Sequence, residues 1–468
     1  MSTARPRRSA PVAVLDIVGL TPRLLPHMPH VRAVAQEGFT SSLTPVFPAL
    51  TCPVQSTFLT GALPRDHGAV ANGWFSRELG EVLNWRQSAD LVTGERVWDE
   101  LRRQRPDTTA ANICWWYAMG AKTEFTVTPR PVYHYDGRKS PDCYTQPPVL
   151  HDELTRRLGT FPLFSYWGPN AGIKSSRWIA AAAGYLVHRA HPDLLLAYVP
   201  HLDYDLQRFG PHGPEAVAAA RELDGVLAPL LSRLHAENYT VVILSEYGIT
   251  QARRPVDINR ALREEGLLRV YTQHGMEYLD PWASRAFALA DHQVANIYVE
   301  DPADVPRVRD LLKSLPGVDE ILDRAGQAAL GADHERSGDM VAVAEPDAWF
   351  TYYYWLDDDR APDFARGVEI FRKPGYDPAE LFFDPSRRAT KIRAAAKLGL
   401  MKAGIRSSLQ VVPLDPTCVG GSHGRLPDSP EDGPLLICSD PSFRKDDFHA
   451  TEVKNLLLHI AGVTPESN

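Results

Sequence analysis

The stretch Val12-Ala13-Val14-Leu15-Asp16-Ile17-Val18 is a short apolar run interrupted by one carboxylate. Such a run is typical of a strand that is buried on both faces, as in a parallel sheet. Two similar runs follow much later, over residues 194–199 and 241–244, and a carboxylate comes shortly after each, Asp203 and Glu246. Ligands bind at the carboxyl ends of the strands in open α/β sheets. We therefore expect the three carboxylates to converge on one site.

Helical patterns separate these predicted strands. Residues 177–189 are rich in alanine with helical spacing, and residues 214–234 have the pattern of another helix. Strands that alternate with helices predict a doubly wound, mostly parallel α/β sheet flanked by helices.

The second half of the chain has a different character. Residues 296–299, 305–315 and 317–322 predict a strand, a helix and a strand, the size of a small α+β unit. Residues 350–356 are aromatic enough for a buried strand or a substrate wall. A chain of 468 residues exceeds the roughly 250–300 that one core accommodates. We predict a core over residues 1–269, an α+β cap or insertion over residues 270–410, and a return to the core over residues 411–468.

Composition narrows the class of protein. A net charge of −8 argues against sequence-independent binding to nucleic acid. The chain has no apolar run of the roughly 20 residues that span a membrane, and its five cysteines are odd in number and widely spaced. We expect a cytoplasmic protein without a disulfide framework. The basic stretch 384–406 predicts a surface helix and loop, either a solvated face or an anion site.

A second informative stretch is Phe47-Pro48-Ala49-Leu50-Thr51-Cys52-Pro53, which precedes Thr60-Gly61, Arg65-Asp66-His67-Gly68 and Asn72. It resembles the nucleophile segment of the nucleotide pyrophosphatase/phosphodiesterase family in the alkaline phosphatase superfamily. The resemblance implies an alkaline-phosphatase-like fold and a threonine, Thr51, that attacks phosphorus while bound to a metal ion. It also implies that Asn72 holds a phosphate oxygen.

The resemblance extends to two metal positions. Family members hold one metal with an Asp after the first strand, the Thr, and the Asp and His of an S-D-H-G motif. They hold the second with the Asp and His of P-D-x-x-G-H and a late His before Gly. The matching residues here are Asp16, Thr51, Glu246 and Tyr247 for the first metal, and Asp203, Gln207 and His423 for the second.

This chain departs from the pattern at three of these seven positions, since Glu246 replaces an Asp, and Tyr247 and Gln207 replace imidazoles. The resemblance implies one or two divalent ions, commonly zinc. Oxygen ligands suit harder ions such as manganese, so the altered set predicts weaker zinc binding and favours one tightly held metal. His292 and His201 are candidate replacement ligands or substrate contacts, and each has the alternative of a structural histidine.

Neighbouring residues have competing interpretations. Asp291 and Asp205 are better explained as caps or surface charges, and Cys52 as packing beside the predicted nucleophile. The aromatic run 115–117 either lies near the substrate entrance or forms a buried cluster.

The sequence thus predicts a metal-dependent hydrolase of a small phosphate ester, most simply a phosphodiesterase or pyrophosphatase with a threonine nucleophile. One alternative is a phosphate-ester binding or regulatory protein whose metal site has decayed. Another is an enzyme of the same scaffold that acts on a monoester, a phosphonate or a sulfate, because one fold hosts many reactions.

Overall fold

A large central sheet organises the structure, a computed structural model that describes residues 10–135, 138–385, 399 and 410–465. The nine strands lie in the order β23-β2-β22-β11-β1-β10-β5-β6-β9. Their bounds are β1 Val12–Ile17, β2 Phe39–Thr44, β5 Ala110–Ile113, β6 Phe125–Pro129, β9 Cys143–Gln146, β10 Leu194–Val199, β11 Thr240–Leu244, β22 Leu435–Cys438 and β23 Asp447–His449.

The middle of this sheet is parallel. Strands β11, β1, β10, β5 and β6 pair in parallel, whereas β22 and β9 are antiparallel to their neighbours. Asp16 lies opposite Tyr198 on β10 and Leu244 on β11, so the carboxyl ends of the three predicted strands are adjacent. The predicted strands and the mostly parallel α/β sheet are confirmed.

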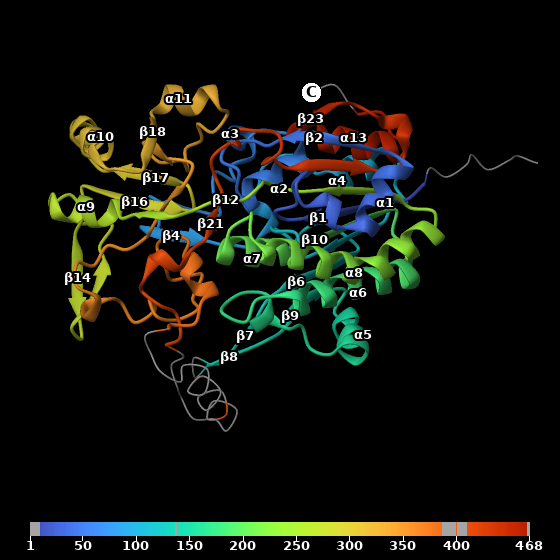
Figure 1. The fold of residues 1–468 in the computed structure, drawn as a ribbon, viewed down its shortest axis with the longest axis horizontal. Helices are drawn as coiled ribbons and strands as arrows, with labels where there is room; N and C mark the ends of the chain where they lie inside the picture. Colours follow the sequence, from blue (N-terminus) through green and yellow to red (C-terminus); the bar gives the residue numbers. More distant parts are fainter. Residues whose placement is uncertain (1–9, 136–137, 386–398, 400–409, 466–468) are drawn as a thin grey trace, which may run out of the picture.

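Helices cover both faces of the sheet (Figure 1). On one side α8 contacts α1, α6 and α7, and on the other α13 contacts α2 and α4. The helices are α1 Pro29–Glu37, α2 Thr51–Thr60, α3 Pro64–His67, α4 Val97–Gln104, α5 Val149–Leu158, α6 Ile173–Ala190, α7 His201–Phe209, α8 Pro214–Ala236 and α13 Val453–Ile460. The two predicted helices correspond to α6 and α8, which are somewhat longer than the sequence pattern indicated.

A smaller antiparallel sheet, at the left of Figure 1, has the strand order β16-β17-β19-β18 and its own apolar core. The strands are β16 Ala286–Asp291, β17 Val294–Val299, β18 Val318–Leu322 and β19 Met340–Ala344, with helices α9 Ile258–Glu264, α10 Val305–Ser314 and α11 Arg324–Ala329. The predicted strand, helix and strand are β17, α10 and β18. The boundaries at residues 269 and 410 stay a prediction.

Short strand pairs complete the fold. They are β3 Gly73–Ser76 with β4 Glu81–Asn84, β7 Val132–Tyr133 with β8 Lys139–Ser140, β12 Thr250–Gln251 with β21 Gly421–Ser422, β13 Arg254–Val256 with β20 Ala348–Phe350, and β14 Val270–Gln273 with β15 Met276–Leu279. No helix among the described residues is long and apolar enough to cross a membrane.

The prediction for residues 350–356 was wrong. Strand β20 ends at Phe350, and the following aromatic side chains, Tyr352 to Trp355, are buried in the core under the smaller sheet. Tyr353 and Trp355 lie 4.7 Å apart between ring centroids, so these rings pack against each other, and they lie outside the lining of the cavity at Thr51. Most of the basic stretch 384–406 lies outside the described residues.

A buried histidine joins α2 to the turn that follows it. His67 is fully buried, its Nε2 lies 3.0 Å from the Thr57 hydroxyl, and its Nδ1 accepts the Ala69 N–H at 3.1 Å. Nδ1 is therefore the unprotonated nitrogen of a neutral ring, and Nε2–H donates to Thr57. Burial lowers the pKa of His67 to about 3.

This histidine predicts an acid-sensitive fold. The pKa of His67 is about 6.5 unfolded and about 3 folded, so the unfolded chain binds more protons between these values. The His67 contribution to stability is complete above pH 6.5 and is lost as the pH falls, by at most about 1.4 kcal/mol per pH unit. The free energy of unfolding, measured with denaturant between pH 7 and pH 5, should fall less steeply with decreasing pH for His67→Gln than for wild type. An equal pH dependence in the two proteins would contradict this assignment.

Candidate active site

Thr51 is the first residue of α2 and lies at the carboxyl edge of the central sheet. Its side chain is buried, and its Oγ1 lies 3.2 Å from the phenol oxygen of Tyr247, which follows β11. Burial raises the pKa of Tyr247 well above its usual value, so the phenol keeps its proton. That proton points to Asp203 Oδ1 at 3.5 Å, which leaves a phenol lone pair for the Thr51 hydroxyl. Tyr247 therefore orients the threonine.

Asp16 and Glu246 form a buried carboxyl pair beneath Thr51. The Gln55 amide nitrogen donates to Asp16 Oδ2 at 3.3 Å and to Glu246 Oε1 at 2.6 Å. The Gln55 carbonyl accepts the Trp116 N–H at 2.8 Å, which fixes the orientation of the amide. Burial raises the pKa of Asp16 to about 7, and burial with the nearby Asp16 charge raises the pKa of Glu246 well above its usual value. Two buried carboxylates this close need a proton or a cation between them.

Asp203, on α7, begins a chain of hydrogen bonds through Gln207 to Tyr376. Its Oδ2 accepts a hydrogen bond of 2.8 Å from the Gln207 amide, and the Gln207 carbonyl accepts one of 3.0 Å from the Tyr376 hydroxyl. Burial raises the pKa of Asp203 to about 7. Gln207 and Tyr247, which stand at positions where the resemblance implies imidazoles, both contact Asp203. The sequence reasoning missed Tyr376, because it lies in no motif.

Two imidazoles face each other beside Asp203. His423 Nδ1 lies 2.9 Å from the Ala49 carbonyl oxygen, and His292 Nδ1 lies 2.8 Å from Asp291 Oδ1. Both partners are acceptors, so Nδ1 carries the proton and Nε2 keeps a lone pair. The ring centroids are 3.8 Å apart, and burial lowers both pKa values well below the usual range. Each ring is neutral and presents a free nitrogen, the state in which histidine binds metals.

Asp291 is a structural residue of the site, so its prediction as a cap or surface charge was wrong. It is buried on β16 and accepts hydrogen bonds from the Asn72 backbone N–H at 3.0 Å and the Asn72 amide at 3.2 Å. The Asn72 side-chain oxygen, Oδ1, accepts the Cys52 backbone N–H at 3.0 Å. The Asn72 side chain thus has protein partners at both ends and lies outside the cavity lining. Its contact with a phosphate oxygen stays a prediction.

His201 lies apart from these residues. It is buried on α7 with Nε2 3.5 Å from Glu222 Oε2 on α8, and it does not line the cavity. The predicted surface role of Asp205 agrees with its ion pair to Arg208 at 3.0 Å. The structure therefore brings together all predicted site residues except His201.

The buried donor set fits a divalent cation. Four of its atoms have no hydrogen-bond partner among the described residues: Asp16 Oδ1, Glu246 Oε2, His292 Nε2 and His423 Nε2. Buried polar atoms are almost always paired, so four unpaired ones in one site indicate a missing partner of positive charge. Carboxylate oxygens and imidazole nitrogens are ligands that zinc and manganese accept.

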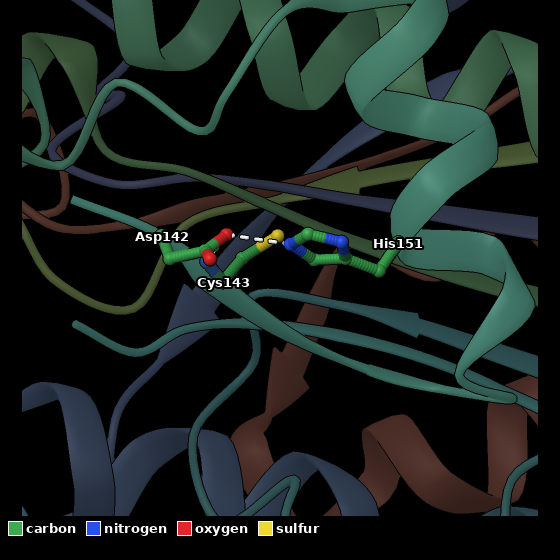
Figure 2. Close-up of side chains that lie close together, drawn as sticks. All are labelled: Asp142, Cys143 and His151. Carbon is green, nitrogen blue, oxygen red and sulfur yellow. Dashed lines mark hydrogen bonds and ion pairs between the residues drawn. The ribbon is translucent and has the colours of Figure 1, made fainter. Parts of the chain in front are cut away.

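A separate group of donors lies in the strand and helix at the far edge of the central sheet. The ligand atoms of Asp142, Cys143 and His151 lie within 4.8 Å of one another (Figure 2). His151 Nε2 already lies 2.7 Å from Asp142 Oδ1, and burial raises the pKa of the Cys143 thiol to about 12. This geometry is that of an aspartate–histidine ion pair beside a packed thiol, so we assign it no metal.

A cavity of about 600 Å³ opens from Thr51. Asp203, Tyr247, His292 and His423 line its inner end, and aromatic side chains line the rest, among them Trp85, Trp116, Trp167 and Tyr376. Trp85 and Trp116 lie 4.8 Å apart between ring centroids. The cavity can hold a phosphate ester with a large apolar or aromatic substituent.

Each of the two interpretations of the aromatic run 115–117 holds for part of it. Trp116 lines the cavity, whereas Trp115 and Tyr117 are buried in the protein. Cys52 is fully buried, and burial raises the pKa of its thiol well above the usual value, so it is a packing residue.

The chain is similar to known proteins of one family. The family model of type I phosphodiesterase / nucleotide pyrophosphatase matches residues 12–377. A pyrophosphatase/phosphodiesterase of Schizosaccharomyces pombe, itself uncharacterised, is 25% identical over 255 residues, which are 52% of this chain and 44% of the relative. The chain thus spans less than half the length of that relative.

Solved structures share the fold. Phosphonoacetate hydrolase from Sinorhizobium meliloti, in complex with phosphonoformate, aligns with a TM-score of 0.63 at 16% identity and covers 97% of each chain. An inactive variant of murine ectonucleotide pyrophosphatase / phosphodiesterase 5, in complex with AMP, aligns with a TM-score of 0.59 at 16% identity, over 98% of this chain and 96% of that chain. With the family model matching over most of its length, the chain belongs to the type I phosphodiesterase / nucleotide pyrophosphatase family.

Proposed function

We propose that this protein is a metal-dependent phosphohydrolase that cleaves a small phosphodiester or pyrophosphate with Thr51 as the nucleophile. The main support is the position of Thr51. Its Oγ1 is hydrogen-bonded to Tyr247, and the residue lines a cavity whose inner end is also lined by Asp203, His292 and His423. Family membership supports the reaction class.

In this proposal the Thr51 oxygen forms a bond to phosphorus and the ester oxygen leaves with a proton as an alcohol. Water then forms a new bond to phosphorus, the bond to Thr51 breaks, and the threonine regains its proton. Tyr247 holds Oγ1 in place through its hydrogen bond to the Thr51 hydroxyl.

Asp203, His292 and His423 would hold one divalent cation, and Asp16, Glu246 and Thr51 would hold a second. When bound, such cations neutralise charge on the phosphoryl oxygens and favour ionised hydroxyls. The first set has two nitrogens and suits zinc, whereas the second has only oxygens and suits manganese or magnesium. We therefore expect one tightly held zinc and one weaker, harder ion.

Metal content tests this assignment. Purified wild-type protein should retain about one zinc per chain by elemental analysis, and His292→Gln should lose most of it, because a free nitrogen ligand is removed. His235→Gln, which alters a histidine that is 78% exposed, is the control and should match wild type. Zinc retained in His292→Gln would exclude His292 as a ligand.

A phosphate-ester binding protein is the second candidate. The Gln55 amide already bridges Asp16 and Glu246, so a shared proton with this donor can replace one cation. Hydrolysis of bis(4-nitrophenyl) phosphate with zinc or manganese separates the two functions. Absence of both bound metal and turnover would favour the binding protein. A panel that adds a monoester, a phosphonate and a sulfate tests the other reactions of the scaffold. The cytoplasmic location stays a prediction.

A further inference from the structure

The outer part of the cavity is nearly balanced in charge. Among the described residues that line it, the Lys and Arg side chains are Lys139 and Arg372, and the carboxylates other than Asp203 are Glu369 and Asp363. Lys139 Nζ forms an ion pair with Glu369 Oε2, and Arg372 lies 3.7 Å from Asp363. The two cations are thus each matched by a carboxylate of the same cavity.

The Lys139–Glu369 pair joins two walls of the cavity. Lys139 lies on β8, which pairs with β7 in a two-stranded sheet separate from the central one, and Glu369 lies in the segment that leads to Tyr376. The Glu369 side chain is 17% exposed and that of Lys139 is 36% exposed, so solvent screens this pair less than a fully exposed one. Arg372 and Asp363 are about half exposed, and their charges are better screened.

Glu369 is held in this position by buried neighbours. Its backbone N–H donates to Glu380 Oε1 at 2.8 Å, and Glu380 Oε2 accepts the Trp167 indole N–H at 2.6 Å. Glu380 itself is buried and lies 2.7 Å from Lys373 Nζ. Buried hydrogen-bonded neighbours therefore fix the backbone of Glu369 at the cavity wall.

We propose that Glu369 determines substrate charge, by neutralising Lys139 so that the outer cavity accepts an uncharged group and disfavours a second phosphate. This inference rests on the proposed function. A monoanionic diester places its one charge at Thr51 and its substituent among Trp85, Trp116 and Trp167. A pyrophosphate diester would bring a second negative charge near Glu369, where the described Lys and Arg side chains of the lining are already paired with carboxylates, and like charges in contact disfavour binding. The preferred substrate class is thus a phosphodiester with an aromatic or apolar alcohol.

The test is the effect of Glu369→Gln on the ratio of kcat/KM for bis(4-nitrophenyl) pyrophosphate to that for bis(4-nitrophenyl) phosphate. The variant leaves Lys139 unmatched, so this ratio should rise by about tenfold. The double variant Glu369→Gln with Lys139→Gln should lose the gain. Glu265→Gln, which removes an exposed carboxylate paired with Arg307 outside the cavity, is the control and should leave the ratio unchanged.

Binding supplies a readout that needs no turnover. In a Thr51→Ala background, quenching of tryptophan fluorescence should report the dissociation constants of 4-nitrophenyl phosphate and 4-nitrophenyl pyrophosphate. Glu369→Gln should shift their ratio toward the pyrophosphate by about tenfold, less so in high salt. An unchanged binding ratio would overturn the role of Glu369. A shifted binding ratio without turnover by the wild type would overturn the proposed hydrolysis and leave the charge selection standing.

Discussion

Thr51→Ala should reduce turnover of a phosphodiester by roughly 10⁴-fold or more, because removal of a nucleophile eliminates the covalent step. Thr51→Ser keeps a hydroxyl at the first position of α2 and should retain measurable activity. The Thr51 side chain is small and its partners, Tyr247 and Glu246, belong to the site itself, so the alanine variant should keep its fold. Release of 4-nitrophenol from bis(4-nitrophenyl) phosphate, measured beside the thermal midpoint of each variant, checks both expectations.

The outcome of this experiment separates the two candidate functions. Turnover that survives in Thr51→Ala at the wild-type rate would refute the threonine mechanism and direct attention to a water nucleophile. Absence of turnover in wild type, with tight binding of an aryl phosphate, would instead support the binding protein.

Lys373→Ala should destabilise the folded state by about 3–5 kcal/mol, since it leaves two buried carboxylates without their cation. Lys373 is 1% exposed, and its Nζ lies 2.6 Å from Asp377 Oδ2 and 2.7 Å from Glu380 Oε1. Burial tends to lower the pKa of Lys373, but the two carboxylates more than offset it and raise the pKa, so the ammonium stays charged. Urea unfolding monitored by tryptophan fluorescence gives the change in free energy.

A matched exposed lysine provides the control. Lys445 pairs with Glu452, and both side chains are nearly half exposed, so Lys445→Ala should cost less than about 1 kcal/mol. The triple variant Lys373→Met, Asp377→Asn and Glu380→Gln removes all three charges and should recover part of the lost stability. Equal effects of Lys373→Ala and Lys445→Ala would show that the buried triad contributes no more than a surface pair.

The sequence allowed a prediction wherever a local pattern, such as a continuous apolar run, determines the structure. The strand that contains Asp16 and the strands that precede Asp203 and Glu246 could be predicted, because continuous apolar runs indicate buried parallel strands. Their convergence followed from the common edge at which parallel strands end. The smaller sheet was only half predicted: β16 and β19 are short apolar runs that pair with β17, but such a run alone does not distinguish a strand from a buried helical segment.

The parts of the site that the sequence did not reveal depend on contacts between distant segments. Gln55 became visible only when the structure placed its amide between Asp16 and Glu246, which are 39 and 191 residues away. Tyr376 contacts Gln207 across 169 residues, and Asp291 contacts Asn72 across 219. Of the two interpretations of His201, its position agrees with a structural histidine, because two residues before Asp203 on a helix the side chain faces away from it, toward α8.

The position of β22 between β11 and β2 has a consequence for synthesis of the chain. Among the described strands, β2 pairs with β22 and β23, both of which follow residue 434. On a ribosome, β2 would therefore wait for about 390 residues before its neighbours exist, roughly 20–80 s at ordinary elongation rates. During that time the nascent chain carries an open strand edge, and His423 is not yet made. The sheet and the site are thus completed at nearly the same point of synthesis, once residues 423–449 have been added.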